Sequence, residues 1–193
     1  MSTEHTAVHR PDWLLFLQRW LRHPRIVGAI APSSGALARA MLAAAAPIAA
    51  PVLELGAGTG VFTRALIDSG VPLSQLRVVE RLPEFADALR RRLPGLSVLE
   101  CDAAELAAHL QPSSFGSVVS GLPLRAMPET QIEAILRAAF ACARPEARFV
   151  QFSYGLRCPV SAAVRQRLGL SAKRVRWVGW NLPPASVWRF ERK

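Results

Sequence analysis

The chain has 193 residues, which is enough for one domain with a sizeable core. Hydrophobic residues make up 51% of it and charged residues only 20%, which excludes a chain that is disordered by composition. The net charge of +10 says nothing about the fold but predicts an anionic partner, either a nucleic acid or a membrane surface.

The N-terminal part of the chain is first polar and then amphipathic. Residues 1–10 are largely polar and predict a flexible tail without a signal peptide. Residues 11–23 predict an amphipathic helix that ends at Pro24, and a second helix is expected over 33–45. At about 100° per residue, one arc of the first helix collects the apolar side chains Trp13, Leu14, Phe16, Leu17, Trp20 and Leu21. Prolines interrupt the apolar region over 26–55, so any membrane contact is expected to be peripheral.

The remainder of the chain alternates between strand and helix patterns. Strands are expected at 51–55, 76–80, 96–99, 116–120, 147–153, 174–180 and 186–191. Helices are expected at 60–69, 83–93, 103–109, 128–143 and 160–168. This alternation predicts a mainly parallel sheet covered on both faces, and the last two strands, which no helix separates, predict an antiparallel hairpin at one end.

The first predicted strand ends in three glycines at alternating positions, Gly56, Gly58 and Gly60. Glycines there let the backbone approach a ligand where any Cβ would collide. The carboxyl end of a strand that leads into a helix is the usual nucleotide pocket of an open α/β sheet. Glu80, at the tip of the second strand, is placed to accept hydrogen bonds from both hydroxyls of a ribose.

The spacing of this loop differs from that of a dinucleotide-binding loop. Its third glycine comes one residue earlier than in G-x-G-x-x-G, and Glu54 lies two residues before the first glycine. A carboxylate at Glu54 would repel a phosphate, and it suits a cationic ligand with an amino-acid end.

The E-x-G-x-G-x-G pattern with a later glutamate resembles motif I and the acidic post-II residue of S-adenosylmethionine (SAM)-dependent methyltransferases. The resemblance implies the Rossmann-like class I α/β fold, SAM as cofactor and S-adenosylhomocysteine as product. It also implies cofactor contacts from Glu54, Gly56, Gly58, Thr59, Gly60, Glu80, Arg81, Asp102, Ala103 and Ser120. Asp102 has a second interpretation as the N-terminal cap of helix 103–109, and both roles can hold together.

The fourth predicted strand ends in Ser120-Gly121-Leu122-Pro123-Leu124, which in this fold faces the departing methyl group. Adenine-N6 methyltransferases carry Asn/Asp-Pro-Pro-Tyr at this tip, and ribosomal RNA adenine dimethylases carry Asn-Leu-Pro-Tyr. This chain keeps Leu-Pro but has Gly121 in place of the amide and Leu124 in place of the aromatic ring. The departure disfavours an adenine substrate.

Six segments together resemble bacterial phospholipid N-methyltransferases over nearly the whole chain: 20–25, 28–34, 52–62, 79–81, 120–124 and 152–155. The resemblance implies stepwise methylation of phosphatidylethanolamine and its mono- and dimethyl derivatives towards phosphatidylcholine. It also implies a cytoplasmic enzyme that binds peripherally to the inner face of the cytoplasmic membrane. We therefore assign 1–10 to a tail, 11–45 to helices that dock on the membrane and cover the pocket, and 46–193 to the methyltransferase domain.

Membrane docking is expected from the first helix and from the basic residues near the C-terminus. The candidates in the N-terminal segment are Trp13, Phe16, Arg19, Trp20, Arg22 and Arg25. Near the C-terminus, Lys173, Arg174 and Arg176 could add attraction, with Trp177 and Trp180 as interfacial anchors. The alternatives are ordinary core packing for the helix and a solvated face for the basic residues.

The candidate catalytic residues are Tyr154, which follows strand five, and Ser120 and Leu122 at the tip of strand four. Tyr154 could hydrogen-bond the substrate amine or face the growing cation. Arg157 is the first candidate for binding a lipid phosphate and Arg125 the second. The alternatives are a rim aromatic for Tyr154 and surface charges for the arginines.

No histidine falls on a predicted strand tip, so no general base is evident, and neither the four histidines nor the three cysteines have ligand spacing, so no metal is expected. Two other functions remain open. One is an RNA adenine methyltransferase of the dimethylase type, and the other is a SAM- or membrane-binding protein without activity. We expect a monomer without a nucleic-acid partner.

Overall fold

The computed structural model describes residues 35–181 and 183–193. The predicted helix over 11–23 therefore lies outside the described residues, together with its docking candidates Trp13, Phe16, Arg19, Trp20, Arg22 and Arg25. Within the part of the chain that the structure describes, no helix is both long and apolar enough to cross a membrane.

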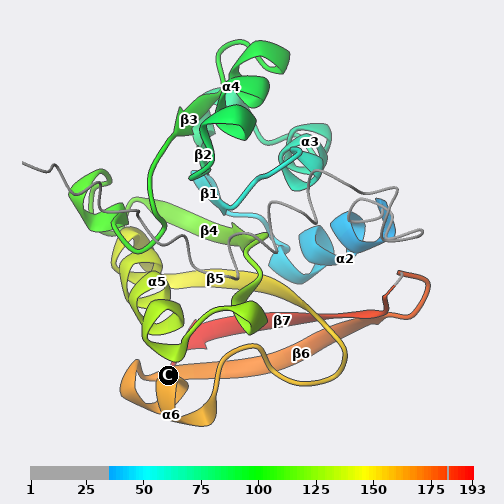
Figure 1. Cartoon of the computed structure of the whole chain (residues 1–193), viewed down its shortest axis with the longest axis vertical. Coiled ribbons are helices and arrows are strands. Elements are labelled where there is room, and N and C mark those ends of the chain that lie inside the picture. The colour runs from blue at the N-terminus through cyan, green and yellow to red at the C-terminus, as the bar shows by residue number, and fades with distance from the viewer. Residues whose placement is uncertain (1–34, 182) are drawn as a thin grey trace, which may run out of the picture.

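A seven-stranded sheet with the strand order β3-β2-β1-β4-β5-β7-β6 forms the centre of the molecule (Figure 1). The strands are β1 Val52–Leu55, β2 Leu76–Val79, β3 Ser97–Leu99, β4 Phe115–Ser120, β5 Ala143–Tyr154, β6 Leu170–Val178 and β7 Ala185–Arg192. Strands β1 to β5 pair in parallel, whereas β7 is antiparallel to both β5 and β6. The predicted α/β fold with an antiparallel end is confirmed.

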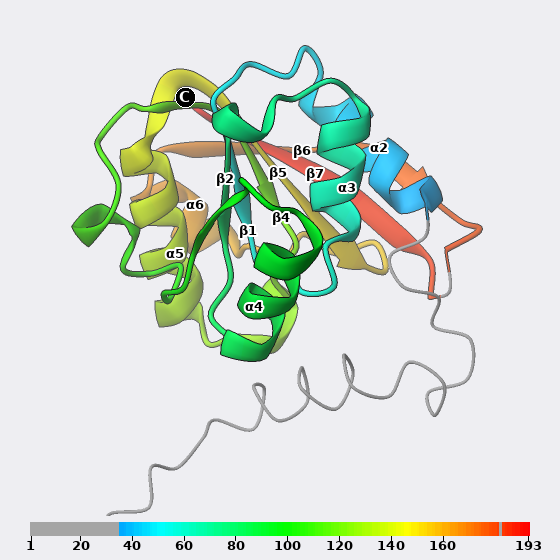
Figure 2. The ribbon, with the colours of Figure 1, turned by 90° about the horizontal axis from the view of Figure 1, so that it is seen from above.

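Helices cover both faces of the sheet (Figure 2). They are α2 Gly35–Ala45, α3 Val61–Asp68, α4 Pro83–Arg92, α5 Glu129–Cys142 and α6 Ala162–Arg167, with short 3-10 turns η1 Leu73–Gln75, η2 Leu106–Ala108 and η3 Leu124–Ala126. Neighbouring residues of β4 point to opposite faces, with Val118 packing in the core under α5 and Val119 in the core under α2 and α3. This two-sided burial explains the nearly continuous apolar runs of the central strands.

The helix predicted over 103–109 is wrong, because only the 3-10 turn η2 forms there. The side chain of Asp102 accepts a hydrogen bond from the backbone N–H of Ala104 at 2.9 Å, which closes a tight turn instead of capping an α-helix. Strand boundaries also differ: β5 begins at Ala143, four residues before the predicted start at 147. The charged residues Arg144 and Glu146 near its start interrupt the apolar pattern by which a buried strand is predicted.

Candidate functional site

The loop between β1 and α3 contains three glycines in the left-handed region, with φ of 67° at Gly56, 53° at Gly58 and 85° at Gly60. Side chains are strained at such angles. Space is limited as well, because a Cβ at Gly56 would lie 2.6 Å from Cδ2 of Leu122, and one at Gly60 would lie 2.7 Å from Cδ2 of Leu89. The loop therefore needs glycine for its backbone angles, and a side chain at Gly56 or Gly60 would in addition have to displace a leucine side chain.

Glu80 directly follows β2, and its side chain forms a hydrogen bond with the glycine loop. One carboxylate oxygen accepts a hydrogen bond from the N–H of Gly58 at 2.8 Å, and the other accepts one from the N–H of Leu82 at 2.9 Å. The residue is 6% exposed, and burial raises the pKa of its carboxyl although these two N–H groups act against the rise. Each carboxylate oxygen can accept one further hydrogen bond, so ribose hydroxyls can still bind here.

Glu54 lies in the middle of β1, behind the glycine loop, and is fully buried. Neither of its carboxylate oxygens has a hydrogen-bond partner among the described residues. Burial raises the pKa of Glu54 to about 8, and the neighbouring Thr63 of α3 partly offsets the rise. A buried carboxylate without a partner is costly, so this position is suited to a cationic group that comes close to it.

The titration of Glu54 predicts that stability falls as the pH rises from the ordinary glutamate pKa of 4.5 to about 8. In this window the folded state holds a proton that the unfolded state has released. The free energy of unfolding therefore decreases by at most about 1.4 kcal/mol per pH unit. We expect Glu54→Gln to flatten this part of the profile in urea unfolding, and the same change at the exposed Glu146 to leave it unchanged. A profile for Glu54→Gln that matches the parent chain would contradict the raised pKa.

The tips of β2 and β3 bring three of the predicted cofactor residues together. Arg81 forms an ion pair with Asp102 at 3.0 Å, and both side chains are partly exposed. Ala103 follows directly and is buried. The ion pair was not evident from the sequence, because the two residues meet only when the parallel strands are aligned.

The tip of β4 lies directly against the glycine loop. The N–H of Gly121 donates to the carbonyl oxygen of Leu55 at 2.7 Å, which continues the pairing of β4 with β1. Ser120 is fully buried, and its hydroxyl accepts a hydrogen bond from the N–H of Leu122 at 3.4 Å. Two of the predicted catalytic positions, Ser120 and Leu122, are thus held beside Gly56.

Gln151 is a site residue that sequence reasoning missed. It lies opposite Ser120 on the neighbouring strand β5, is fully buried, and donates a hydrogen bond to the carbonyl oxygen of Leu122 at 2.8 Å. The available signal was a single amide between the apolar residues Val150 and Phe152 of the predicted strand 147–153. Gln151 thus fixes the backbone of the loop that follows β4.

Tyr154 ends β5 and continues a series of aromatic rings that starts with Phe62 in the first turn of α3. The ring centroids of Phe62 and Phe152 are 5.8 Å apart, and those of Phe152 and Tyr154 are 5.5 Å apart. Burial raises the pKa of Tyr154 to about 12, so its phenol keeps its proton at neutral pH. The third predicted catalytic residue therefore lies on the same face of the sheet as α3, beyond the tip of β4.

The two arginines predicted to bind phosphate lie on the segments that follow the carboxyl ends of β4 and β5. Arg157 follows β5 and Arg125 lies in η3, after β4, and both are exposed. Within the described ranges, neither guanidinium group forms an ion pair with a carboxylate. The structure brings both arginines to the side of the sheet where Tyr154 and Leu122 lie, and their roles stay predictions.

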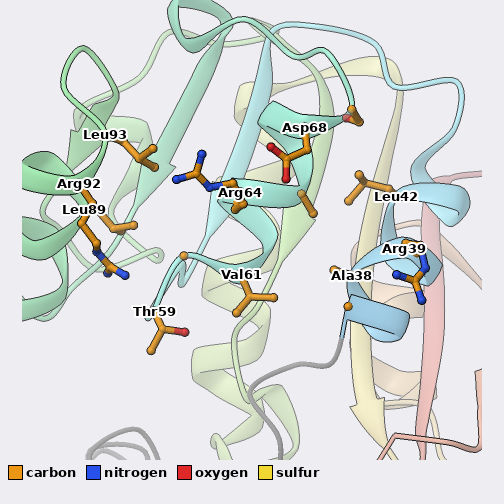
Figure 3. A pocket seen from close by; sticks show the side chains of 14 residues that line it. Ala38, Arg39, Leu42, Thr59, Val61, Arg64, Asp68, Leu89, Arg92 and Leu93 are labelled. Carbon is orange, nitrogen blue, oxygen red and sulfur yellow. The ribbon is translucent and has the colours of Figure 1, made fainter.

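An open groove of about 630 Å³ flanks the glycine loop on its outer side, between α2, α3 and α4 (Figure 3). Thr59 and Gly60 of the glycine loop are among its lining residues. Its charged lining consists of Arg39, Arg64, Arg92 and Asp68. The flank of the loop therefore carries a net positive charge among its lining residues.

Comparisons with known proteins agree with this arrangement. A family model described as a methyltransferase domain matches residues 52–146. An ornithine lipid N-methyltransferase from Singulisphaera acidiphila is 33% identical over 149 residues, which cover 74% of this chain and 78% of that protein.

Two solved structures share the fold at low sequence identity. A 1,6-didemethyltoxoflavin-N1-methyltransferase from Burkholderia thailandensis, with S-adenosylhomocysteine bound, matches all of this chain and 94% of its own with a TM-score of 0.68 and 16% identity. TrmN from Thermus thermophilus matches 92% of this chain with a TM-score of 0.67 and 18% identity, and this chain spans about half of that protein (53%). The family match, the lipid methyltransferase relative and the shared fold show that this chain belongs to the class I SAM-dependent methyltransferases, with SAM as its cofactor.

Proposed function

We propose that this methyltransferase N-methylates the amine headgroup of a membrane lipid at an anionic membrane surface. The observation that carries the proposal is the 33% identity to a protein named as an ornithine lipid N-methyltransferase. The candidate substrates are phosphatidylethanolamine with its mono- and dimethyl derivatives, which the resemblance to phospholipid N-methyltransferases suggests, and an ornithine lipid. Phosphatidylethanolamine and an ornithine lipid both carry a primary amine in a headgroup that also holds an anionic group, and both carry acyl chains.

The described residues fit the cofactor. The glycine loop leaves its backbone open because Gly56, Gly58 and Gly60 carry no Cβ. Glu54 offers a buried carboxylate to the ammonium of the methionine moiety, directly or through water. We also propose that Thr59 and Ser120 contact the cofactor. Glu80 would accept hydrogen bonds from the ribose hydroxyls. Arg81, Asp102 and Ala103 would lie towards the adenine.

When bound, SAM supplies a methyl group that its sulfonium already activates, so the protein mainly has to position the amine and exclude water. Leu122 forms an apolar wall beside the glycine loop. Tyr154 keeps its phenol neutral at physiological pH. Its oxygen can accept an amine N–H and so orient the nitrogen lone pair, while its ring can face the ammonium that grows with each methylation.

The remaining parts of the proposal concern the lipid. Arg157, and secondarily Arg125, would bind the oxygens of the headgroup anion, since arginine binds such oxygens in pairs. Trp13, Phe16, Arg19, Trp20, Arg22 and Arg25, which lie outside the described residues, remain candidates for docking on the inner face of the cytoplasmic membrane. No nucleic acid is part of this proposal, and the protein is proposed to act as a monomer.

The test is transfer of a radiolabelled methyl group from SAM to vesicles that contain either phosphatidylethanolamine or an ornithine lipid, each with and without phosphatidylglycerol. We expect label in the lipid fraction, increased by the anionic lipid. Total RNA is a parallel substrate, because an RNA adenine methyltransferase is the alternative enzyme. Label in RNA with none in either lipid would overturn the proposal.

Replacing the tyrosine separates an enzyme from an inactive binder. We expect Tyr154→Ala to lower kcat/KM for the vesicle substrate by at least about tenfold, which corresponds to about 1.4 kcal/mol of transition-state stabilisation. Tyr154→Phe keeps the ring and should retain part of this activity. The affinity for SAM, measured by calorimetry, should stay close to that of the parent chain in both variants. Equal turnover in all three proteins would exclude a role for Tyr154.

A further inference from the structure

We propose that the structure contains a second membrane-docking surface, at the turn between β6 and β7 and the loop after β5. We call it the edge patch and define it by the apolar side chains of Leu156, Trp177 and Trp180 and the cations Arg157, Arg174 and Arg176. Its partner is an anionic lipid bilayer. The inference rests on the proposed function, since it specifies how the molecule is turned towards a lipid substrate.

The edge patch contains the large apolar side chains that the described part of the chain leaves exposed. Trp180 is 99% exposed, Leu156 60% and Trp177 46%. All other large apolar residues among those described are buried or half-buried. Large apolar side chains that gather in one exposed area indicate a site of interaction with a protein or a membrane.

The topology places these residues at the edge of the sheet that holds the cofactor loop. Because β7 is antiparallel to β5, the chain enters β7 beside the end of β5, where Ala185 pairs with Tyr154. The turn before β7 therefore lies at the carboxyl end of the parallel strands. Figure 1 shows this turn and the loop after β5 on the side to which the arrows of β4 and β5 point.

Hydrogen bonds hold the two halves of the edge patch together. The N–H of Gly155 donates to the carbonyl oxygen of Pro184 at 3.0 Å, and the hydroxyl of Ser186 donates to the carbonyl oxygen of Gly155 at 2.7 Å. The hydroxyl of Ser153 in turn donates to the carbonyl oxygen of Arg157 at 3.2 Å. The loop that carries Leu156 is thus fixed beside the turn that carries Trp180.

Among the described residues, the charged side chains of the edge patch are all cations and form no ion pair. Arg157, Arg174 and Arg176 are exposed, as is the nearby Lys173, and none of the four forms an ion pair with a described carboxylate. On α5, by contrast, Glu133 forms ion pairs with both Arg137 and Arg167. Cations without an ion-pair partner in the described part of the chain, beside exposed tryptophans, match the headgroup region of an anionic leaflet.

A bilayer fits this surface better than a nucleic acid does. Arginines and a tryptophan could bind phosphates and stack on bases, but Leu156 offers neither a stacking face nor a hydrogen bond. Entry into the acyl boundary of a bilayer removes both Leu156 and Trp180 from water. It also turns the strand tips with Leu122 and Tyr154 towards the leaflet, so that a lipid amine reaches them without leaving the bilayer.

The experiment compares full-length variants in cosedimentation with vesicles of phosphatidylcholine that contain or lack phosphatidylglycerol. We expect Trp180→Ala to lower the partition coefficient on phosphatidylglycerol vesicles by about tenfold, and Trp180→Phe to retain most of the binding. Arg176→Glu should lower it by about tenfold at low salt, because the variant replaces attraction with repulsion. Arg91→Glu is the matched control: it changes the net charge equally, on an exposed position of α4 beside β3, at the other end of the sheet.

Two further readouts keep this inference separate from the proposed function. The SAM affinity and the melting temperature should be the same in all of these variants, which excludes unfolding as the cause. Methyl transfer to a monomeric short-chain amino lipid should be unchanged by Trp180→Ala, whereas transfer to vesicles should fall. If no lipid is methylated at all, the proposed function fails while the partition data still decide the docking surface.

Either of two results would overturn the edge patch as a docking surface. One is that Trp180→Ala has the same partition coefficient as the parent chain, and Arg176→Glu the same partition coefficient as Arg91→Glu. The other is that the variants lose binding to a labelled RNA and keep their binding to vesicles.

Discussion

Glu80→Ala is expected to lower the affinity for SAM by at least about 100-fold, because hydrogen bonds to a charged group contribute about 1.5–3 kcal/mol each. The substitution removes the proposed acceptor of the ribose hydroxyls. It also leaves the N–H groups of Gly58 and Leu82 without their acceptor, so the glycine loop loses its lateral support. Calorimetric titration with SAM and with S-adenosylhomocysteine measures both affinities.

The control for this experiment is Glu146→Ala, which removes a carboxylate of the same kind from an exposed position at the beginning of β5, away from the strand tips. It should bind SAM as the parent chain does. Glu80→Gln is an intermediate variant: its amide oxygen can still accept one of the two backbone hydrogen bonds, while the charge and the second acceptor are lost. An affinity of Glu80→Ala within threefold of the control would show that Glu80 does not bind the cofactor.

The second large effect is expected for Gly121→Ala, at the tip of β4. A Cβ at this position would lie 2.6 Å from the carbonyl oxygen of Gly56, and backbone atoms cannot move aside as a flexible side chain can. The strands β1 and β4 would have to separate where the glycine loop begins, so we expect the free energy of unfolding to fall by about 1–3 kcal/mol. We also expect the SAM affinity to fall by about tenfold, which corresponds to about 1.4 kcal/mol.

Gly116→Ala separates these two effects. A Cβ at Gly116, near the beginning of β4, would lie 2.6 Å from the carbonyl oxygen of Ala49, which is the same kind of collision away from the site. Urea unfolding should show a similar loss of stability in both variants, whereas only Gly121→Ala should lose SAM affinity. Equal losses of affinity in the two variants would mean that Gly121 acts through stability alone.

Most of the cofactor site was predictable because its signals are local in the sequence. The glycine loop needs positive φ at three alternating positions, and glycine is the residue that accepts such angles. Glu80 directly follows a short apolar strand, so its place at a strand tip followed from the strand itself. The helix over 103–109 was predicted wrongly, although its sequence pattern is also local. The hydrogen bond from the N–H of Ala104 to the carboxylate of Asp102 favours a turn over a helix there.

The remaining site features depend on which strands become neighbours. The hydrogen bond of Gln151 to Leu122 and the ion pair of Arg81 with Asp102 could not be predicted before the alignment of the parallel strands was known. The aromatic series from Phe62 to Tyr154 joins two segments about 90 residues apart in the chain.

The sequence by itself therefore determined the succession along the chain of the seven strands and of most helices, the glycine loop and the acidic residues around it, because backbone angles and apolar periodicity are properties of adjacent residues. Only the tertiary structure decided that Glu54 is buried without a hydrogen-bond partner among the described residues and that Leu156 lies beside the turn with Trp180. Burial and contact between distant segments arise from strand order and register, which no single segment encodes.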